Sequence, residues 1–330
     1  MIGLGLIGGS LLRALATAGH RVMGYDLDPA TRATARTAAA QAPANARWQV
    51  PGSIADAVRR PGGSGPDFVV VAVPLPAVGA VFDEVAATGY AGVVTDATSV
   101  KEPVRALAAT RLRHGGQAMA SFVGGHPMAG RETSGFGAAD AHLFDGCAWV
   151  LCLEPEETSL ADWLALAALY TGLGAQVVPA TAADHDRAVA TVSHVPHLLA
   201  AALAARINGD PLAATLAAGS FRDGTRVAAS APALIATICG GNAGRVRQAL
   251  DAVLADLDQA RAALDAPDPI VALLPWLRVG STARAAWPPQ AGESAELPAR
   301  AEVLLRLGQV GGWVTGVAAD RRTVTAVRPA

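Results

Sequence analysis

Two periodicities of apolar residues divide the chain. In its first half, short continuous apolar runs, typical of parallel strands covered on both faces, alternate with longer stretches of helical pattern. The apolar runs are residues 67–74, 92–96, 118–123, 147–153 and 176–178, and the helical stretches are residues 29–40, 53–60, 76–88, 101–113 and 160–173. This alternation predicts an α/β fold over residues 1–180, a doubly wound parallel sheet that is Rossmann-like in its right-handed crossovers.

The strand pattern stops near residue 181. Helical patterns over residues 182–207, 211–218 and 242–264 predict an all-helical second domain, residues 181–265. Its first helix is apolar nearly all round, so we expect it to be buried against the partner subunit of a homodimer, with a kink at Pro196. Residues 266–330 are a C-terminal extension of unknown role, in which the apolar runs 312–317 and 323–327 predict a terminal hairpin.

A glycine pattern opens the chain. Gly3, Gly5 and Gly8 fit G-x-G-x-x-G, in which one glycine makes a tight turn, the next lets the backbone approach a pyrophosphate, and the third lets helix pack on strand. Residues 10–18, which follow, are good helix formers, and the N-terminal amides and dipole of a helix that starts here attract phosphate. Leu6 and Ile7, between the glycines, are expected to contact the cofactor as well. These residues predict a dinucleotide-binding site.

The acid Asp26 indicates which dinucleotide binds. It lies 18 residues after Gly8, at the end of an apolar run, where a carboxylate binds the ribose 2′-hydroxyl and repels a 2′-phosphate. NAD is therefore predicted in preference to NADP. Only Met1 and Ile2 precede the glycines, whereas a strand of about five residues is expected there, so we expect the true start of the protein to lie upstream of Met1.

Composition narrows the class of protein. A formal net charge of -2 gives no reason to expect nucleic acid or an anionic membrane as a partner. The longest apolar stretch, residues 188–207, contains two histidines and a proline and indicates a buried helix rather than a membrane span. Cys147, Cys152 and Cys239 have no metal-ligand or redox spacing, which favours free thiols in a reducing compartment, the cytoplasm.

Two segments after predicted strands carry candidate chemistry, because ligands of such sheets bind beyond the carboxyl ends of strands. Ser99 either caps the next helix or places a hydroxyl beside the nicotinamide and the substrate, and the two roles are compatible. His126, between a glycine and a proline, suits an acid or base at a cleft, although a tie to its own loop is the alternative. Glu132 is either a second polar group of this site or solvated.

The helical domain adds two histidines and two arginines. His194 and His197 lie three residues apart on one helical face; they lack further ligands at metal spacing, so no metal is predicted, and substrate contact or a buried hydrogen-bonded pair remains open. Arg222 and Arg226, in a segment predicted to be a loop over residues 219–226, either bind substrate carboxylates or form surface ion pairs.

The order of these motifs resembles the prephenate/arogenate dehydrogenase family of tyrosine biosynthesis. The matching segments are residues 3–10, Ser99-Val100-Lys101, residues 124–130, His185-Asp186, residues 193–197 and residues 219–226. The resemblance implies an enzyme that oxidises and decarboxylates a small-molecule substrate with NAD. It implies that His126 accepts the proton of the C4 hydroxyl, that Ser99 positions this hydroxyl and the nicotinamide, that Arg226 binds a substrate carboxylate, that His197 lies near the substrate side chain and that Glu132 lies at the pocket mouth.

The sequence leaves the substrate open. Arg131 and residues 231–235 depart from the family pattern, which puts pocket shape in doubt. Prephenate is the expected substrate, and arogenate or an amino-substituted prephenate is the alternative. An alternative of another class is a catalytically inactive dinucleotide-binding regulator, and retention of Ser99, His126 and Arg226 together argues against it.

Overall fold

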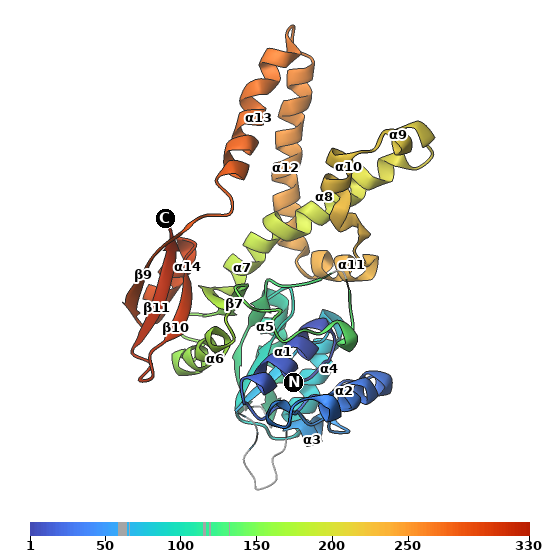
Figure 1. Cartoon of the computed structure of the whole chain (residues 1–330). Coiled ribbons are helices and arrows are strands. Elements are labelled where there is room, and N and C mark those ends of the chain that lie inside the picture. The colour runs from blue at the N-terminus through green and yellow to red at the C-terminus, as the bar shows by residue number, and fades with distance from the viewer. Residues whose placement is uncertain (59–64, 66, 115–116, 119, 132) are drawn as a thin grey trace. The chain divides into compact units, whose positions relative to one another are not determined.

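The computed structural model describes residues 1–58, 65, 67–114, 117–118, 120–131 and 133–330 (Figure 1). The chain forms two compact units. The first contains residues 1–185 and 293–328, and the second contains residues 186–292 with the last two residues. The first unit is therefore built from two separate stretches of sequence.

A parallel sheet lies at the centre of the first unit. It contains β1 (Phe68–Val71), β2 (Val93–Asp96) and β5 (Ser121–Val123), in the order β1-β2-β5. Single-residue parallel bridges extend it beyond β1: Ile2 bridges to both Val71 and Tyr25, and Met23 bridges to Gln49. The apolar run 21–26 therefore joins the sheet through isolated residues, and Ile2 occupies the position between Tyr25 and β1.

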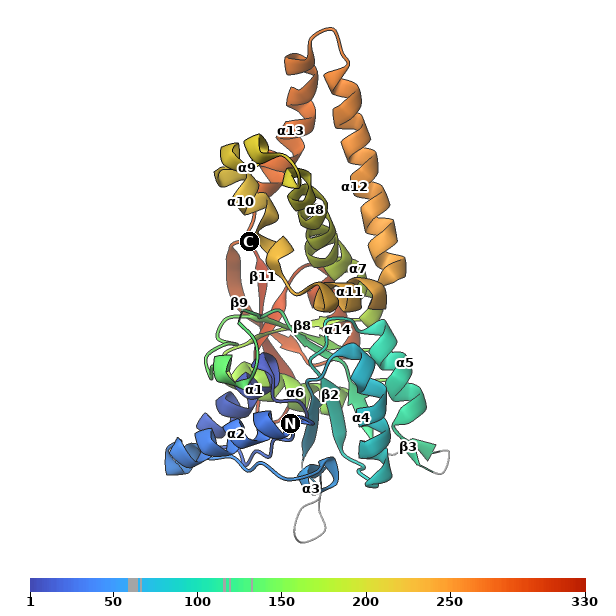
Figure 2. The same ribbon diagram turned by 90° about the vertical axis from the view of Figure 1, so that its right-hand side faces the viewer.

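Alternate residues of β1 face two different cores. Val69 and Val71 pack with Phe82 of α4 (Leu75–Ala87) and with α5 (Glu102–Arg111), whereas Val70 packs with α1 (Leu6–Thr17) and α6 (Leu160–Gly172). Figure 2 shows α4 and α5 on one side of these strands and α1 on the other. Such two-sided cover explains the continuous apolar run of the sequence.

The remaining elements of this part of the chain are short or peripheral. They are α2 (Pro29–Gln41), η1 (Ala44–Ala46), α3 (Ile54–Val58), β3 (Arg113–His114), β4 (Gln117–Ala118) and η2 (Phe136–Ala138). Asp28 caps α2 by accepting hydrogen bonds from the amides of Ala30 and Thr31. The hydroxyl of Thr31 also donates to this carboxylate, and that bond, together with the two amide bonds, lowers the pKa of the carboxyl group.

A second sheet of the first unit has six strands. They are β6 (Gly125–Pro127), β7 (Ala148–Cys152), β8 (Gln176–Ala180), β10 (Trp313–Val317), β11 (Thr323–Pro329) and β9 (Ala291–Pro298), in that spatial order. Only β7 and β8 pair in parallel in the registers described, while β6–β7, β8–β10 and β10–β11 are antiparallel. Gly124 alone separates β5 from β6, which is too short for a crossover helix, so β6 enters this other sheet.

The C-terminal segment completes the core of the first unit. The predicted terminal hairpin is present as β10 and β11, and β10 pairs with β8. Leu304 and Leu307 of α14 (Ala301–Gln309) and Val314 of β10 are fully buried in the cluster that also contains Trp149 and Trp163. The backbone of Gly308 lies so close to β8 that a Cβ there would be 1.7 Å from the carbonyl oxygen of Pro179.

Residues 186–290, all of which are described, contain only helical elements. The elements are α7 (Ala182–Val189), a π-helical turn (Ala190–His194), α8 (Val195–Ala204), η4 (Ala205–Ile207), α9 (Pro211–Leu216), α10 (Gly219–Thr225), η5 (Arg226–Ala229), α11 (Pro232–Gly241), α12 (Ala243–Leu264) and α13 (Pro269–Ala285). Figure 1 shows α12 and α13 as a long helical hairpin.

The structure of this unit differs from the sequence-based expectations at three places. The irregularity predicted at Pro196 takes the form of the π-helical turn just before it, since proline cannot donate an amide hydrogen bond. The prediction of a loop over residues 219–226 is wrong, because this segment is α10 followed by η5; its glycines do not interrupt a short helix. Helix α13 lies in the first part of the C-terminal extension, before the predicted hairpin, where the sequence pattern assigned no element.

Large apolar side chains are exposed on the helical unit. Val192, Leu203, Leu257 and Leu277 are between 44% and 68% exposed within one chain. The helical run Ala182–Ile207 is long and apolar enough to cross a membrane by length and composition, and only 28% of its most apolar window is buried in the chain. A partner subunit that covers such faces accounts for the same observation.

The packing of α14 on β8 gives a stability prediction. We expect Gly308→Ala to lower the free energy of unfolding by about 3 kcal/mol or more, because the added methyl group meets a backbone carbonyl that has little room to move. Gly172→Ala is the control, since nothing lies within 4 Å of a Cβ at that exposed position on α6. Chemical denaturation of both variants measures the difference; equal stability would contradict this account of the C-terminal packing.

Candidate active site

The three glycines of the opening turn have three different environments. Gly3 has a φ of +92°, and a Cβ there would lie 2.3 Å from the carbonyl oxygen of Ala72, so this position requires glycine. A Cβ on Gly8 would lie 2.0 Å from the carbonyl oxygen of Gly3. Because glycine has no Cβ, α1 can pack directly against the turn. Nothing lies within 4 Å of a Cβ on Gly5, the residue before α1, so the backbone is open to a ligand there.

Asp26 is tied to the same turn. Its carboxylate accepts hydrogen bonds from the amide of Leu4 at 2.7 Å and from the amide of Asp28 at 2.9 Å. Each carboxylate oxygen can accept more than one bond, so Asp26 retains capacity for ribose hydroxyls. The guanidinium of Arg32 donates to the carbonyl oxygens of Asp26 and Leu27 at 2.6 and 2.9 Å and lies 5.4 Å from the ring of Tyr25.

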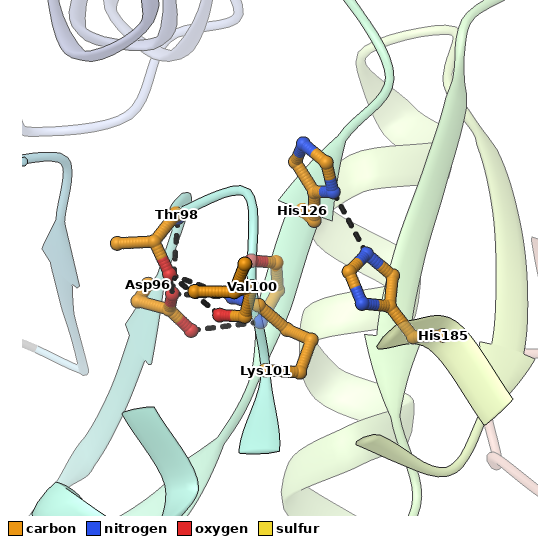
Figure 3. Close-up of polar contacts among 7 residues, drawn as sticks. Asp96, Thr98, Val100, Lys101, His126 and His185 are labelled. Atoms are coloured by element: carbon orange, nitrogen blue, oxygen red, sulfur yellow. Dashed lines mark hydrogen bonds and ion pairs between the residues drawn. The ribbon is translucent and has the colours of Figure 1, made fainter. Parts of the chain in front are cut away.

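A buried ion pair stands at the carboxyl end of β2 (Figure 3). Asp96 and Lys101 are 0% and 1% exposed and form a direct salt bridge. Asp96 also accepts from the amide and hydroxyl of Thr98 and from the amide of Gly125, the latter at 3.0 Å. Lys101 donates further to the hydroxyl of Thr98 and to the carbonyl oxygen of Gly125. Sequence reasoning noticed Lys101 only as part of a motif and missed Asp96 as a functional group, since burial is not readable from one sequence.

Ser99 lies within the loop that this ion pair holds. It is half-buried, between Thr98 and Val100. The helix that follows begins at Glu102, its preceding residue is Lys101, and no side chain caps it. The interpretation of Ser99 as a helix cap is therefore wrong, while its proposed role beside a cofactor is compatible with its place at the end of β2.

His126 lies on β6, directly after the glycine that Asp96 and Lys101 hold. It pairs with Val150 of β7 and is half-buried. Its Nδ1 atom lies 2.8 Å from Nε2 of His185 on α7, and the two rings meet edge to face at 74°. The alternative, a histidine tied only to its own loop, does not describe this contact, because the partner is 59 residues away in sequence.

The helical unit holds the other predicted residues. His194 is 1% exposed, and its Nδ1 lies 3.3 Å from the side-chain nitrogen of Asn242, which also donates to the carbonyl oxygen of Asp186 at 2.7 Å. His197 is half-buried, with Nδ1 3.2 Å from the carbonyl oxygen of Val227. The two histidines thus have separate hydrogen-bond partners.

Arginines of the same unit lie at its surface. Arg226 begins η5 and is exposed, and Arg222 is 80% exposed beside Asp223 at 3.6 Å. Glu132 lies outside the described residues. Among the residues that the structure does describe, no group of three or more histidine, cysteine or acidic side chains is arranged to hold a metal ion.

Comparison with known proteins places these segments in one family. Residues 11–179 match the family model described as "Prephenate dehydrogenase, nucleotide-binding domain", and residues 181–276 match "Prephenate dehydrogenase, dimerization domain". The prephenate dehydrogenase of Bacillus subtilis is 31% identical over 276 residues, which cover 81% of this chain and 70% of that protein. The cyclohexadienyl dehydrogenase of Zymomonas mobilis is 34% identical over 279 residues, covering 81% and 88%. The crystal structure of a Corynebacterium glutamicum protein is 34% identical, with a TM-score of 0.76 over 87% of this chain and 89% of the other.

The buried ion pair gives the prediction of this section. Lys101→Met leaves the Asp96 carboxylate buried without its cation, and we expect a loss of about 3–5 kcal/mol in the free energy of unfolding. Arg111→Met is the matched control, because Arg111 and Asp83 form an ion pair whose side chains are 51% and 48% exposed; its loss should cost at most about 1 kcal/mol. If denaturant titration gives equal losses, Lys101 does not hold this end of the sheet.

Proposed function

This chain belongs to the prephenate dehydrogenase family, and we propose that it oxidises and decarboxylates prephenate to 4-hydroxyphenylpyruvate with NAD, a step of tyrosine biosynthesis. The observation that carries the proposal is the set of hydrogen bonds around Asp96. Through them, the loop of Ser99 and the strand of His126 are fixed to one another at the end of β2. A hydroxyl and an imidazole are thereby held at one end of a nucleotide-binding sheet, where ligands of such folds bind.

The residues present fit NAD. The open backbone at Gly5 and the start of α1 at Leu6 and Ile7 suit a pyrophosphate, because the first amides of a helix have no partner within it. Asp26 suits the adenosine ribose and disfavours a 2′-phosphate. When bound, NAD supplies the acceptor for the hydride that leaves C4 of the substrate.

The side chains of the protein transfer the proton of the C4 hydroxyl and orient the substrate. His126 accepts the proton of the C4 hydroxyl as the C4–H bond breaks, and Ser99 orients this hydroxyl. The bond between C1 and the ring carboxylate then breaks, and carbon dioxide leaves. The electron pair of the broken bond stays in the ring and makes it aromatic. The proton on His126 returns to the phenolate oxygen, so the enzyme ends the cycle unchanged.

The remaining assignments follow the family resemblance residue by residue. Arg226 binds a substrate carboxylate, for which a guanidinium offers two parallel donors. His197 contacts the substrate side chain, and Glu132 lies at the mouth of the pocket. Arogenate is the second candidate substrate, because the Zymomonas mobilis relative has the broader name cyclohexadienyl dehydrogenase.

The proposed assembly is a homodimer in the cytoplasm. Residues 181–276 match a dimerization domain, and the exposed apolar side chains on α8, α12 and α13 need cover. Cys147, Cys152 and Cys239 form no disulfide in this structure, which is compatible with a reducing compartment.

The first test is an assay of NADH absorbance with prephenate and with arogenate. His126→Asn should lower kcat by about 10²–10⁴-fold, because it removes the base and leaves the glycine turn unchanged. Arg226→Ala should mainly raise KM, by the equivalent of about 2–3 kcal/mol. The melting temperature of each variant is measured in parallel. Losses of activity that only follow losses of stability would reject these roles, and a wild-type protein that binds NAD but oxidises neither substrate would favour the regulator.

A second prediction concerns the cofactor. The wild type should prefer NAD over NADP by at least tenfold in kcat/KM, about 1.4 kcal/mol. Asp26→Asn keeps an acceptor for the amide of Leu4 and removes the charge, so its preference for NAD should shrink. Equal kcat/KM values of the wild type for the two cofactors would show that Asp26 does not select between them.

A further inference from the structure

A second histidine reaches the proposed base from a different element. His185 of α7 is 3% exposed, and its Nε2 lies 2.8 Å from Nδ1 of His126. Figure 3 shows the two rings pointing toward one another, one from β6 and one from the helix. Sequence analysis identified His185 as part of a motif and assigned it no role.

The start of α7 is anchored, so the position of His185 is well defined. The amide of Ala182 donates to the carboxylate of Glu154 at 2.6 Å. Thr181 accepts from the amide of Asp184 at 3.1 Å, and its hydroxyl donates to the Asp184 carboxylate at 2.9 Å. The amide of His185 closes the first turn on the carbonyl oxygen of Thr181. These bonds fix the helix turn from which the imidazole extends.

A hydrogen bond between two imidazole nitrogens contains one proton, so one ring donates and the other accepts. The contact occupies Nδ1 of His126, so a proton taken from a substrate hydroxyl would go to Nε2. Nε2 can accept only if Nδ1 carries the hydrogen. That tautomer requires Nε2 of His185 to be the acceptor.

His185 is the group that faces Nδ1 of His126. Its burial keeps bulk water away from the contact between the two rings. Asp96 and Lys101, at the neighbouring end of β2, form an ion pair and bind the amide and the carbonyl of Gly125, the residue before His126. When His126 takes a proton, its Nδ1–H becomes a stronger donor, and His185 stabilises the imidazolium that forms.

We propose that His185 is a positioning residue that holds His126 in the Nδ1–H tautomer and so keeps its Nε2 ready to accept the substrate proton. The proposal rests on the proposed function for the identity of that proton. The tautomer itself is a property of the protein without substrate.

Two substitutions of His185 distinguish the loss of its hydrogen-bond acceptor from a change in side-chain volume. His185→Leu removes the acceptor, whereas His185→Gln keeps a carbonyl oxygen near the place of Nε2. We expect His185→Leu to lower kcat by about 10–100-fold, by analogy with the loss of a group that orients a metal-bound histidine. KM for the substrate and the Kd for NAD should stay within about twofold, and His185→Gln should recover most of the rate. His20→Gln, at an exposed position after α1, is the control and should be unchanged.

The pH profile is the second readout. Without an acceptor for Nδ1–H, the imidazolium of His126 is less stable, so the acidic limb of kcat/KM should move to lower pH in His185→Leu. A merely structural role of His185 would lower activity and melting temperature together and leave this limb in place.

Nitrogen-15 NMR of histidine-labelled full-length protein tests the tautomer without catalysis. His126→Asn identifies the signals of His126 by their loss. The wild type should show His126 protonated at Nδ1, and His185→Leu should move it toward Nε2–H. A wild-type His126 in the Nε2–H form, or a tautomer unaffected by His185→Leu, would overturn the proposal. Absence of dehydrogenase activity in the wild type would instead reject the proposed function, and the NMR result would still decide the role of His185.

Discussion

The arrangement of the site depends on one buried carboxylate. Asp96 ends β2, and its hydrogen bonds reach its own loop, the ammonium of Lys101 and the first amide of β6. Removing two charges from water is costly, and the pair is stable only because all three donors of the ammonium and both carboxylate oxygens are satisfied. The close approach also explains Gly125, where a Cβ would lie 2.6 Å from the carbonyl oxygen of Asp96. The strand of the proposed base therefore has one position relative to the sheet.

The parts of the site that the sequence predicted are those in which chemistry and local geometry coincide. A glycine turn needs glycine at Gly3 for backbone reasons and at Gly5 for ligand access, so the pattern is visible in the sequence itself. His126 was visible because a glycine and a proline fix the backbone around it. The central strands were visible because two-sided burial leaves continuous apolar runs.

The features that sequence reasoning missed depend on contacts between distant residues. A single sequence does not show that the Asp96 carboxylate accepts a hydrogen bond from an amide 29 residues away. Nor does it show that the ring of His185 contacts the ring of His126 from another element. Gly219 and Gly224 indicated a loop because glycine has a low intrinsic helix propensity. Tertiary packing overrides that propensity in α10, and it cannot be read from the local sequence. Strands β8 and β10 pair antiparallel although they are more than 130 residues apart in sequence, and no local pattern specifies such a pairing.

The interruption of the first unit by the helical one has a consequence for biosynthesis. The core around Trp149 and Trp163 stays incomplete until Leu304, Leu307 and Val314 have been made, long after the nucleotide-binding turn has left the ribosome. During translation of the intervening helices, one edge of β8 and part of an apolar core remain uncovered, and such exposed edges invite aggregation. Synthesis of α14 and β10 covers this edge and completes the core, so the nascent chain is most exposed to aggregation before these two elements emerge.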